Sequence, residues 1–175
     1  KHIIPIQPLF ARDNIQRGGQ TRSSARNVTH GRIEALTPRG ILVCVSLSCP
    51  EGLRLDAVIT DASRRRLGLE VGGLVCASVK APWVELVPEA QPLPPPSGLG
   101  ASAGVPQNIF QARVADLRGD DDVVEAVVRL PGGGEWCAVR YRAEDPWCSG
   151  LREGDVVQVR FSASAVILNS LDPLA

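Results

Sequence analysis

The sequence has 175 residues, of which 22% are charged and 44% hydrophobic, and its formal net charge is zero. This composition is typical of a folded globular protein rather than a disordered one, and the length allows one domain or two small ones. The longest apolar run, residues 41–47, is far shorter than the roughly 18 residues of a membrane-spanning helix. The first residues lack the apolar segment of a signal peptide and methionine is absent, so we expect a segment of a longer or processed product.

A proline-rich segment, residues 88–106, divides the chain into two parts. It holds six prolines and cannot form a helix or a central strand, so we expect an extended linker. The parts on either side are repeats, because residues 31–60 align without a gap with residues 112–141. The predicted domains are a linker or dimer-packing segment (1–22), a first repeat (23–87), the linker (88–106) and a second repeat (107–171).

Each repeat predicts the same elements in the same order. A long alternating strand is followed by a β-branched strand, a glycine-bearing hairpin loop and a third strand. A helix of about two turns comes next, ended by Gly68 or Gly150, and two short strands complete the unit. The predicted strands are 28–36, 41–47, 53–59, 74–79 and 84–87 in the first repeat, and 109–117, 123–130, 135–141, 156–161 and 166–168 in the second. This order predicts an all-β, β-rich fold with short helices, built as tandem OB-like five-stranded barrels.

Cysteine and histidine usage argues against a metal site and against catalysis. Five cysteines are present without a Cys-x-x-Cys pair, and the two histidines are His2 and His30. A structural zinc site is therefore not expected, and no Ser-His-Asp or Cys-His set is available for an enzyme. Cys44 and Cys76 lie in apolar alternating segments, so we expect reduced core thiols and a reducing, cytoplasmic setting.

The charges are unevenly spread along the chain. Residues 1–87 hold twelve Lys and Arg against seven Asp and Glu, and residues 88–175 hold seven against twelve. The first half is thus +5 and the second −5, which favours an anion site in the first half.

Three polar clusters of the first repeat have no equivalent in the second: Ser23-Ser24-Ala25-Arg26-Asn27, Thr60-Asp61-Ala62-Ser63 and Lys80-Ala81-Pro82-Trp83. Thr60 stands where a helix N-cap is expected, and Ser63 lies one turn further, so both hydroxyls lie at the positive end of the helix dipole. Lys80 adds a compact positive charge, and Arg26 adds a planar set of donors that matches paired oxygens. Together these groups would suit a divalent oxyanion.

Each cluster also has an ordinary structural interpretation. Thr60 and Ser63 alone would be helix capping, and Arg26 and Lys80 alone would be solvated surface residues. Trp83 is more often core packing than a ligand contact.

Taken together and in order, the clusters resemble the molybdenum-binding Mop family of the TOBE superfamily. The pattern consists of Ser24-Ala25-Arg26-Asn27, Thr60-x-x-Ser63, Leu67-Gly68-Leu69-x-x-Gly72 and Lys80-Ala81. The tandem copy resembles a di-Mop unit, most like the C-terminal sensing half of bacterial molybdate-responsive transcription regulators. The resemblance runs from about residue 23 to residue 171.

The resemblance implies a homodimer that binds an intact oxyanion, molybdate or tungstate, at two sites between the subunits. No protein side chain would ligate the metal itself. Ser24 and Arg26 would come from one subunit, and Thr60, Ser63 and Lys80, with the Ala81 amide, from the other. Asn27 belongs to the same motif and is a further candidate binding residue.

The second repeat departs from this pattern. Pro106-Gln107-Asn108 stands near the Ser-Ala-Arg-Asn position, Glu144 and Asp145 lie near the Ser63 position, and Ser162 replaces Lys80. Acidic groups repel a dianion, so we expect this repeat to be structural or partner-facing. The family's regulators carry an N-terminal winged helix-turn-helix, for which residues 1–21 are too short, so DNA binding is expected only through a domain outside this chain.

The resemblance leaves several functions open. In a sensor, oxyanion binding would rigidify a dimer and bias an attached output domain. The alternatives are a cytoplasmic molybdate storage or carrier protein, which would usually show binding residues in both repeats, and the regulatory tail of a molybdate ABC transporter ATPase. Nucleic-acid binding by the barrels would need aromatic stacking on a basic face, and the seven aromatic residues are not interleaved with a basic stripe.

Overall fold

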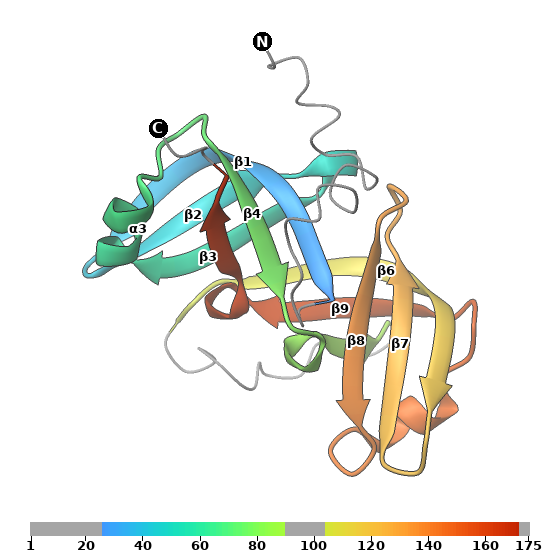
Figure 1. Ribbon diagram of the computed structural model, residues 1–175. Coiled ribbons are helices and arrows are strands. Elements are labelled where there is room, and N and C mark those ends of the chain that lie inside the picture. The colour runs from blue at the N-terminus through green and yellow to red at the C-terminus, as the bar shows by residue number, and fades with distance from the viewer. Residues whose placement is uncertain (1–25, 90–103, 172–175) are drawn as a thin grey trace.

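The computed structural model describes residues 26–89 and 104–171, which form two five-stranded antiparallel sheets (Figure 1). These sheets confirm the predicted all-β class. Segment 1–22, Ser24 and most of the linker lie outside the described residues.

The elements follow the predicted order in both repeats. The first repeat holds β1 (Asn27–Arg39), β2 (Leu42–Ser48), η1 (Pro50–Gly52), β3 (Arg54–Thr60), α3 (Asp61–Leu67), β4 (Leu74–Val79), η2 (Ala81–Trp83) and β5 (Glu85–Pro88). The second holds β6 (Gln107–Gly119), β7 (Val123–Arg129), β8 (Glu135–Tyr141), η3 (Pro146–Gly150), β9 (Val156–Ser162), η4 (Ala163–Ala165) and β10 (Ile167–Ser170). Here α marks an α-helix and η a 3-10 turn.

The long first strand of each repeat is shared between two partners. β1 pairs with β4 through residues 27–32 and with β2 through residues 32–39. The register of β1 against β2 shifts between Ile33 and Ala35, and that of β6 against β7 shifts at the equivalent position. Such a bulge bends a strand and increases its twist, which lets one strand serve both halves of a curved sheet.

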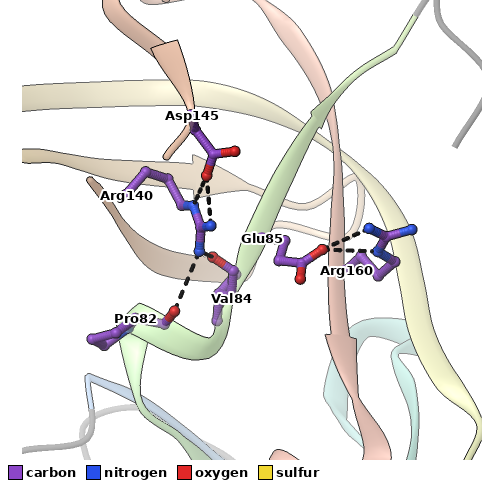
Figure 2. Close-up of polar contacts among 6 residues, drawn as sticks. All are labelled: Pro82, Val84, Glu85, Arg140, Asp145 and Arg160. Carbon is purple, nitrogen blue, oxygen red and sulfur yellow. Dashed lines mark hydrogen bonds and ion pairs between the residues drawn. The ribbon is translucent and has the colours of Figure 1, made fainter. Parts of the chain in front are cut away.

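Each sheet takes its last strand from the other repeat, an exchange that the repeat pattern did not predict. β10 pairs with β4 in the first sheet, and β5 pairs with β9 in the second (Figure 1). At the second junction, the buried Arg160 of β9 donates to Glu85 Oε1 of β5 through Nε (3.0 Å) and Nη2 (2.7 Å) (Figure 2). The two sequence repeats are therefore interlocked rather than separate folding units.

Two buried asparagines join each repeat to an edge strand of the other. Asn27, at the start of β1, donates from Nδ2 to the Cys137 carbonyl (2.8 Å) and accepts the Cys137 N–H at Oδ1 (2.6 Å). Asn108, at the equivalent position of β6, makes the same two bonds with the backbone of Asp56 (2.9 and 2.8 Å). A primary amide carries both a donor and an acceptor, so each side chain continues the sheet edge as a backbone partner would.

The hairpin loops of the two repeats pack against each other. Glu51, in η1, has a left-handed φ of 63°. A Cβ built on Gly132, in the equivalent loop of the second repeat, would lie 2.4 Å from the Glu51 carbonyl oxygen. The loops can approach this closely because residue 132 has no side chain.

The short helix is present in the first repeat and absent from the second. Thr60 caps α3 and Gly68, with a φ of 66°, ends it, as predicted. The predicted two-turn helix before Gly150 is wrong, because this segment is the 3-10 turn η3. The carboxylate of Asp145 binds Arg140, and it forms no capping hydrogen bond at the start of this segment.

One apolar core runs through both sheets, and the cysteines belong to it or lie near it. All five cysteines are buried and free, which confirms the predicted core positions of Cys44 and Cys76. Burial raises the pKa of Cys49 to about 12 and that of Cys148 to about 11, so both thiols stay protonated at neutral pH. No helix within the described ranges is long and apolar enough to cross a membrane.

Candidate functional site

Arg26 and Lys80 stand next to each other at one end of the first sheet. β1 and β4 are antiparallel, and Asn27 pairs with Val79, so the residue before β1 lies opposite the residue after β4. Both side chains are exposed. Two adjacent cations at a strand end produce a local positive potential that attracts an anion.

The turn that follows Lys80 is held by the second repeat. Arg140, on β8, donates from Nη1 to the carbonyl oxygens of Pro82 and Val84, at 3.2 Å each (Figure 2). On its other side, Arg140 Nε donates to Asp145 Oδ2 (2.7 Å). The Arg140 side chain is only 12% exposed, so these bonds hold the Lys80 turn in one position.

Trp83 is a surface residue of this turn, which corrects the interpretation as core packing. Ala81 and Val84 take the buried positions, whereas 44% of Trp83 is exposed. The indole is thus presented to solvent close to Lys80 in the sequence, where a second molecule or a ligand can contact it.

Thr60 and Ser63 lie at the start of α3. Thr60 Oγ1 accepts the Ser63 N–H (3.0 Å) and donates to Ser63 Oγ (3.0 Å). Helix capping, the ordinary interpretation, is therefore confirmed for Thr60. The Ser63 hydroxyl, which accepts in this pair, keeps its own proton for a further acceptor.

The charge of the carboxylate at this helix start is balanced. Arg64 Nε bonds to one oxygen of Asp61 and Arg65 Nε to the other, both at 2.8 Å. The hydrogen bond from Arg64 lowers the pKa of Asp61, with smaller contributions from both guanidinium charges. Asp61 stays ionised with two cations beside it, so it does not give the helix start a net negative charge.

The hydroxyls and the cations lie at opposite ends of the first sheet. Leu42 pairs with Arg39, the last residue of β1, and with Thr60, whereas Arg26 precedes the first residue of β1. A strand of this length spans about 40 Å when straight. Figure 1 shows α3 at one end of the sheet and the green turn after β4 at the other.

This separation changes how the predicted residues are grouped. We call Arg26, Lys80 and Ala81 the cationic end, and Thr60 and Ser63 the hydroxyl end. One chain cannot bring both ends onto one small anion. The strand register places Lys80 beside Arg26 and far from Thr60 and Ser63, whereas the sequence analysis grouped it with Thr60 and Ser63.

Two other predicted residues have different outcomes. Asn27 is 3% exposed, and its amide is paired with the backbone of Cys137, so it anchors the start of β1 rather than facing solvent. Ser24 lies outside the described residues, and its role stays a prediction. Arg26 Nη1 forms an ion pair with Glu125 Oε2 of β7 (2.5 Å).

A model of the TOBE domain matches residues 23–86 of the chain. The chain is also similar to a solved structure of the cytoplasmic molybdate-binding protein ModG with molybdate bound, at 31% identity and a TM-score of 0.71. The match covers 86% of this chain and 99% of that one. The chain belongs to the Mop/TOBE family.

Two curated relatives of the Mop/TOBE chain are transcription regulators. The transcriptional regulator ModE of Yersinia pestis is 32% identical over 151 residues. The DNA-binding transcriptional dual regulator ModE of Escherichia coli K12 is 28% identical over 151 residues. The match covers 86% of this chain and 53% of each relative, so the chain spans about half the length of these proteins.

The second repeat keeps the strand order of the first but not the polar residues of its candidate site. Ser162, which replaces Lys80, accepts the Ser164 N–H (3.0 Å) and caps η4. Asp145, near the Ser63 position, is bound to Arg140. Asn108 keeps the structural role of Asn27. The equivalent turn therefore lacks the cation of the first repeat.

Two residues that act on the candidate site were missed in the sequence. Glu125 contacts Arg26, and Arg140 holds the Lys80 turn. In the gapless alignment of the repeats they stand opposite Cys44 and Ile59. A charged residue in one repeat opposite an apolar residue in the other is the signal that could have identified them.

A pocket of about 480 Å³ lies elsewhere, on the second repeat, and contains none of the predicted site residues. Arg113 and Arg129 line it, but Arg113 donates to the Gly154 carbonyl and Arg129 pairs with Glu135. Within the described residues, no group of three or more His, Cys, Asp and Glu side chains is placed to hold a metal ion.

Proposed function

We propose that this chain is the oxyanion-sensing module of a molybdenum-responsive transcription regulator, with molybdate or tungstate as its ligand. The observation that carries the proposal is the match to ModG with molybdate bound, which covers nearly all of that chain. The regulator context comes from the ModE relatives. DNA contact would be made by a part of such a regulator that lies outside this chain, and the setting would be cytoplasmic.

The chemistry of the two ends fits a tetrahedral dianion. Arg26 and Lys80 supply two positive charges, and hydrogen bonds between charged donors and oxyanions are stronger than neutral ones. Ser63 supplies a hydroxyl donor, while Thr60 orients it. These groups bind and orient the anion, and none of them is placed for a covalent or proton-transfer step. The proposal is therefore capture of the ligand without catalysis.

The separation of the two ends supports a homodimer. In a two-fold symmetric pair, the cationic end of one subunit faces the hydroxyl end of its partner, and the same contact recurs by symmetry. Each dimer then holds two sites, each completed by both subunits. Ligand binding bridges the subunits and so biases their arrangement, which is what a sensor needs.

The second candidate is a molybdate storage or carrier protein. Its support is that ModG, a cytoplasmic molybdate-binding protein, is matched over its whole length, whereas the regulators are matched over about half of theirs. The lack of a cation at the Lys80 position in the second repeat favours the sensor, because a storage protein gains capacity from sites in both repeats.

A complementation experiment tests the shared site. Lys80→Ala removes a cation from the cationic end. Ser63→Glu places a carboxylate at the hydroxyl end while forming a Thr60-x-x-Glu capping box, so the helix is retained. Each variant alone should bind molybdate about a hundredfold or more weaker than wild type, because both sites of its homodimer are defective.

Coexpression of the two variants should restore binding. Random assembly makes half of the dimers mixed, and each mixed dimer has one intact site, so about a quarter of the wild-type capacity returns. Equilibrium dialysis against molybdate measures this capacity. Absence of any recovery in verified mixed dimers would refute the grouping of Lys80 with Arg26 across from Thr60 and Ser63.

A further inference from the structure

The guanidinium group of Arg26 already has an anionic partner in the second repeat. Arg26 Nη1 lies 2.5 Å from Glu125 Oε2, and the side chains are 52% and 32% exposed. Glu125 belongs to β7, ninety-nine positions away in the chain. A carboxylate and an oxyanion both bind the donors of a guanidinium group, so they compete for Arg26.

The backbone beside Arg26 is fixed against the same part of the second repeat. Asn27 forms its two buried bonds with Cys137 on β8, and Cys137 pairs with Val127, two residues from Glu125. Burial raises the pKa of the Cys137 thiol, and of the smaller effects the charge of Arg26 lowers this pKa and that of Glu125 raises it. The hydrogen bonds between the two repeats therefore hold the backbone of Arg26 close to Glu125.

We propose that Glu125 is an internal competitor of the oxyanion, which occupies Arg26 in the empty site and is displaced when the ligand binds. This inference rests on the proposed function and assigns a role to the second repeat. Glu125 lowers the affinity of the site for any dianion through competition and repulsion.

Glu125→Gln tests this role because it removes the charge and keeps the size of the side chain. The affinity for molybdate should rise about tenfold, since a weak ion pair no longer has to be broken and repulsion of the dianion is removed. Isothermal titration calorimetry with sodium molybdate on the full chain measures this change. The melting temperature of the ligand-free variant should stay equal or fall slightly.

Glu135→Gln is the matched control. Glu135 also forms an exposed ion pair, with Arg129 on the neighbouring strand (2.7 Å), in the sheet that contains Glu125. Glu135→Gln changes the net charge by the same amount as Glu125→Gln, but Glu135 does not contact Arg26. The affinity of this variant for molybdate should therefore stay within about twofold of wild type.

The outcomes separate this inference from the proposed function. A wild-type chain that binds molybdate, with unchanged or weaker binding by Glu125→Gln, would overturn the role of Glu125 alone. Equal gains in Glu125→Gln and Glu135→Gln would reduce the effect to net charge and would also overturn it. A folded wild-type chain that binds no oxyanion would overturn the proposed function, and this inference with it.

Discussion

Lys80→Ala is expected to weaken molybdate binding by about a hundredfold or more, with the fold unchanged. Lys80 is exposed and makes no ion pair within residues 26–89 and 104–171, so its charge is available to a ligand. The Arg140 side chain donates hydrogen bonds to the carbonyl oxygens of Pro82 and Val84 in the turn after Lys80. The substitution leaves these bonds in place. Calorimetric titration measures the loss of affinity, and the thermal unfolding curve should match that of wild type.

The control for this substitution is Arg54→Ala. Arg54 is an exposed cation of the first repeat, paired with Glu34, and lies in neither the cationic end nor the hydroxyl end. Its removal lowers the net charge by the same amount and should change the affinity by no more than about twofold. An equal loss in both variants would mean that the ligand responds to net charge and not to a site.

Gly132→Ala is expected to destabilise the chain by about 2–4 kcal/mol, a large effect for one added methyl group. The new Cβ would lie 2.4 Å from the carbonyl oxygen of Glu51, which belongs to backbone and cannot rotate away. The hairpin loops of both repeats would have to separate. Urea-induced unfolding, followed by tryptophan fluorescence, gives the free energy of unfolding.

Gly150→Ala is the paired control. Gly150 lies in the same repeat, has no heavy atom within 4 Å of a built Cβ and does not have a positive φ. The substitution should change the free energy of unfolding by less than about 1 kcal/mol, because it adds no clash and restricts the unfolded chain. Similar losses in both variants would show that the contact between the loops is not the cause.

Most of the local structure could be predicted from the sequence, because each element except the turn before Gly150 follows its own pattern. Alternation placed the strands, and Thr60 and Gly68 placed the ends of α3. The exchange of β5 and β10 could not be predicted in this way. Both strands have four residues and follow a similar 3-10 turn, so neither carries a local pattern that selects its partner sheet.

The candidate site could be predicted as a set of residues but not as an arrangement. Order along the chain does not reveal that Thr60 and Lys80 lie at opposite ends of one sheet, since this depends on strand register. Asn27 is instructive, because the second repeat, which lacks the other site residues, keeps an asparagine at the equivalent position 108. A residue retained where the other candidate residues are replaced indicates a structural role, and the paired backbone bonds of both asparagines agree with it.

The second repeat gains a definite role from these contacts. Through Arg140 it positions the turn that carries Lys80, through the Cys137 backbone it anchors the start of β1, and through Glu125 it holds Arg26. All three contacts converge on the cationic end of the first repeat. We therefore propose that the second repeat sets the affinity of the site in the first repeat.

The measurement that tests the central claim most directly is a calorimetric titration of the wild-type chain with sodium molybdate, with sodium sulfate as the competing dianion. We predict saturation near one molybdate per chain, the value for two shared sites in a dimer, and much weaker binding of sulfate. Saturation near two per chain would favour the storage function and a site in the second repeat. A folded chain that takes up no molybdate would contradict the proposal that this member of the family senses an oxyanion.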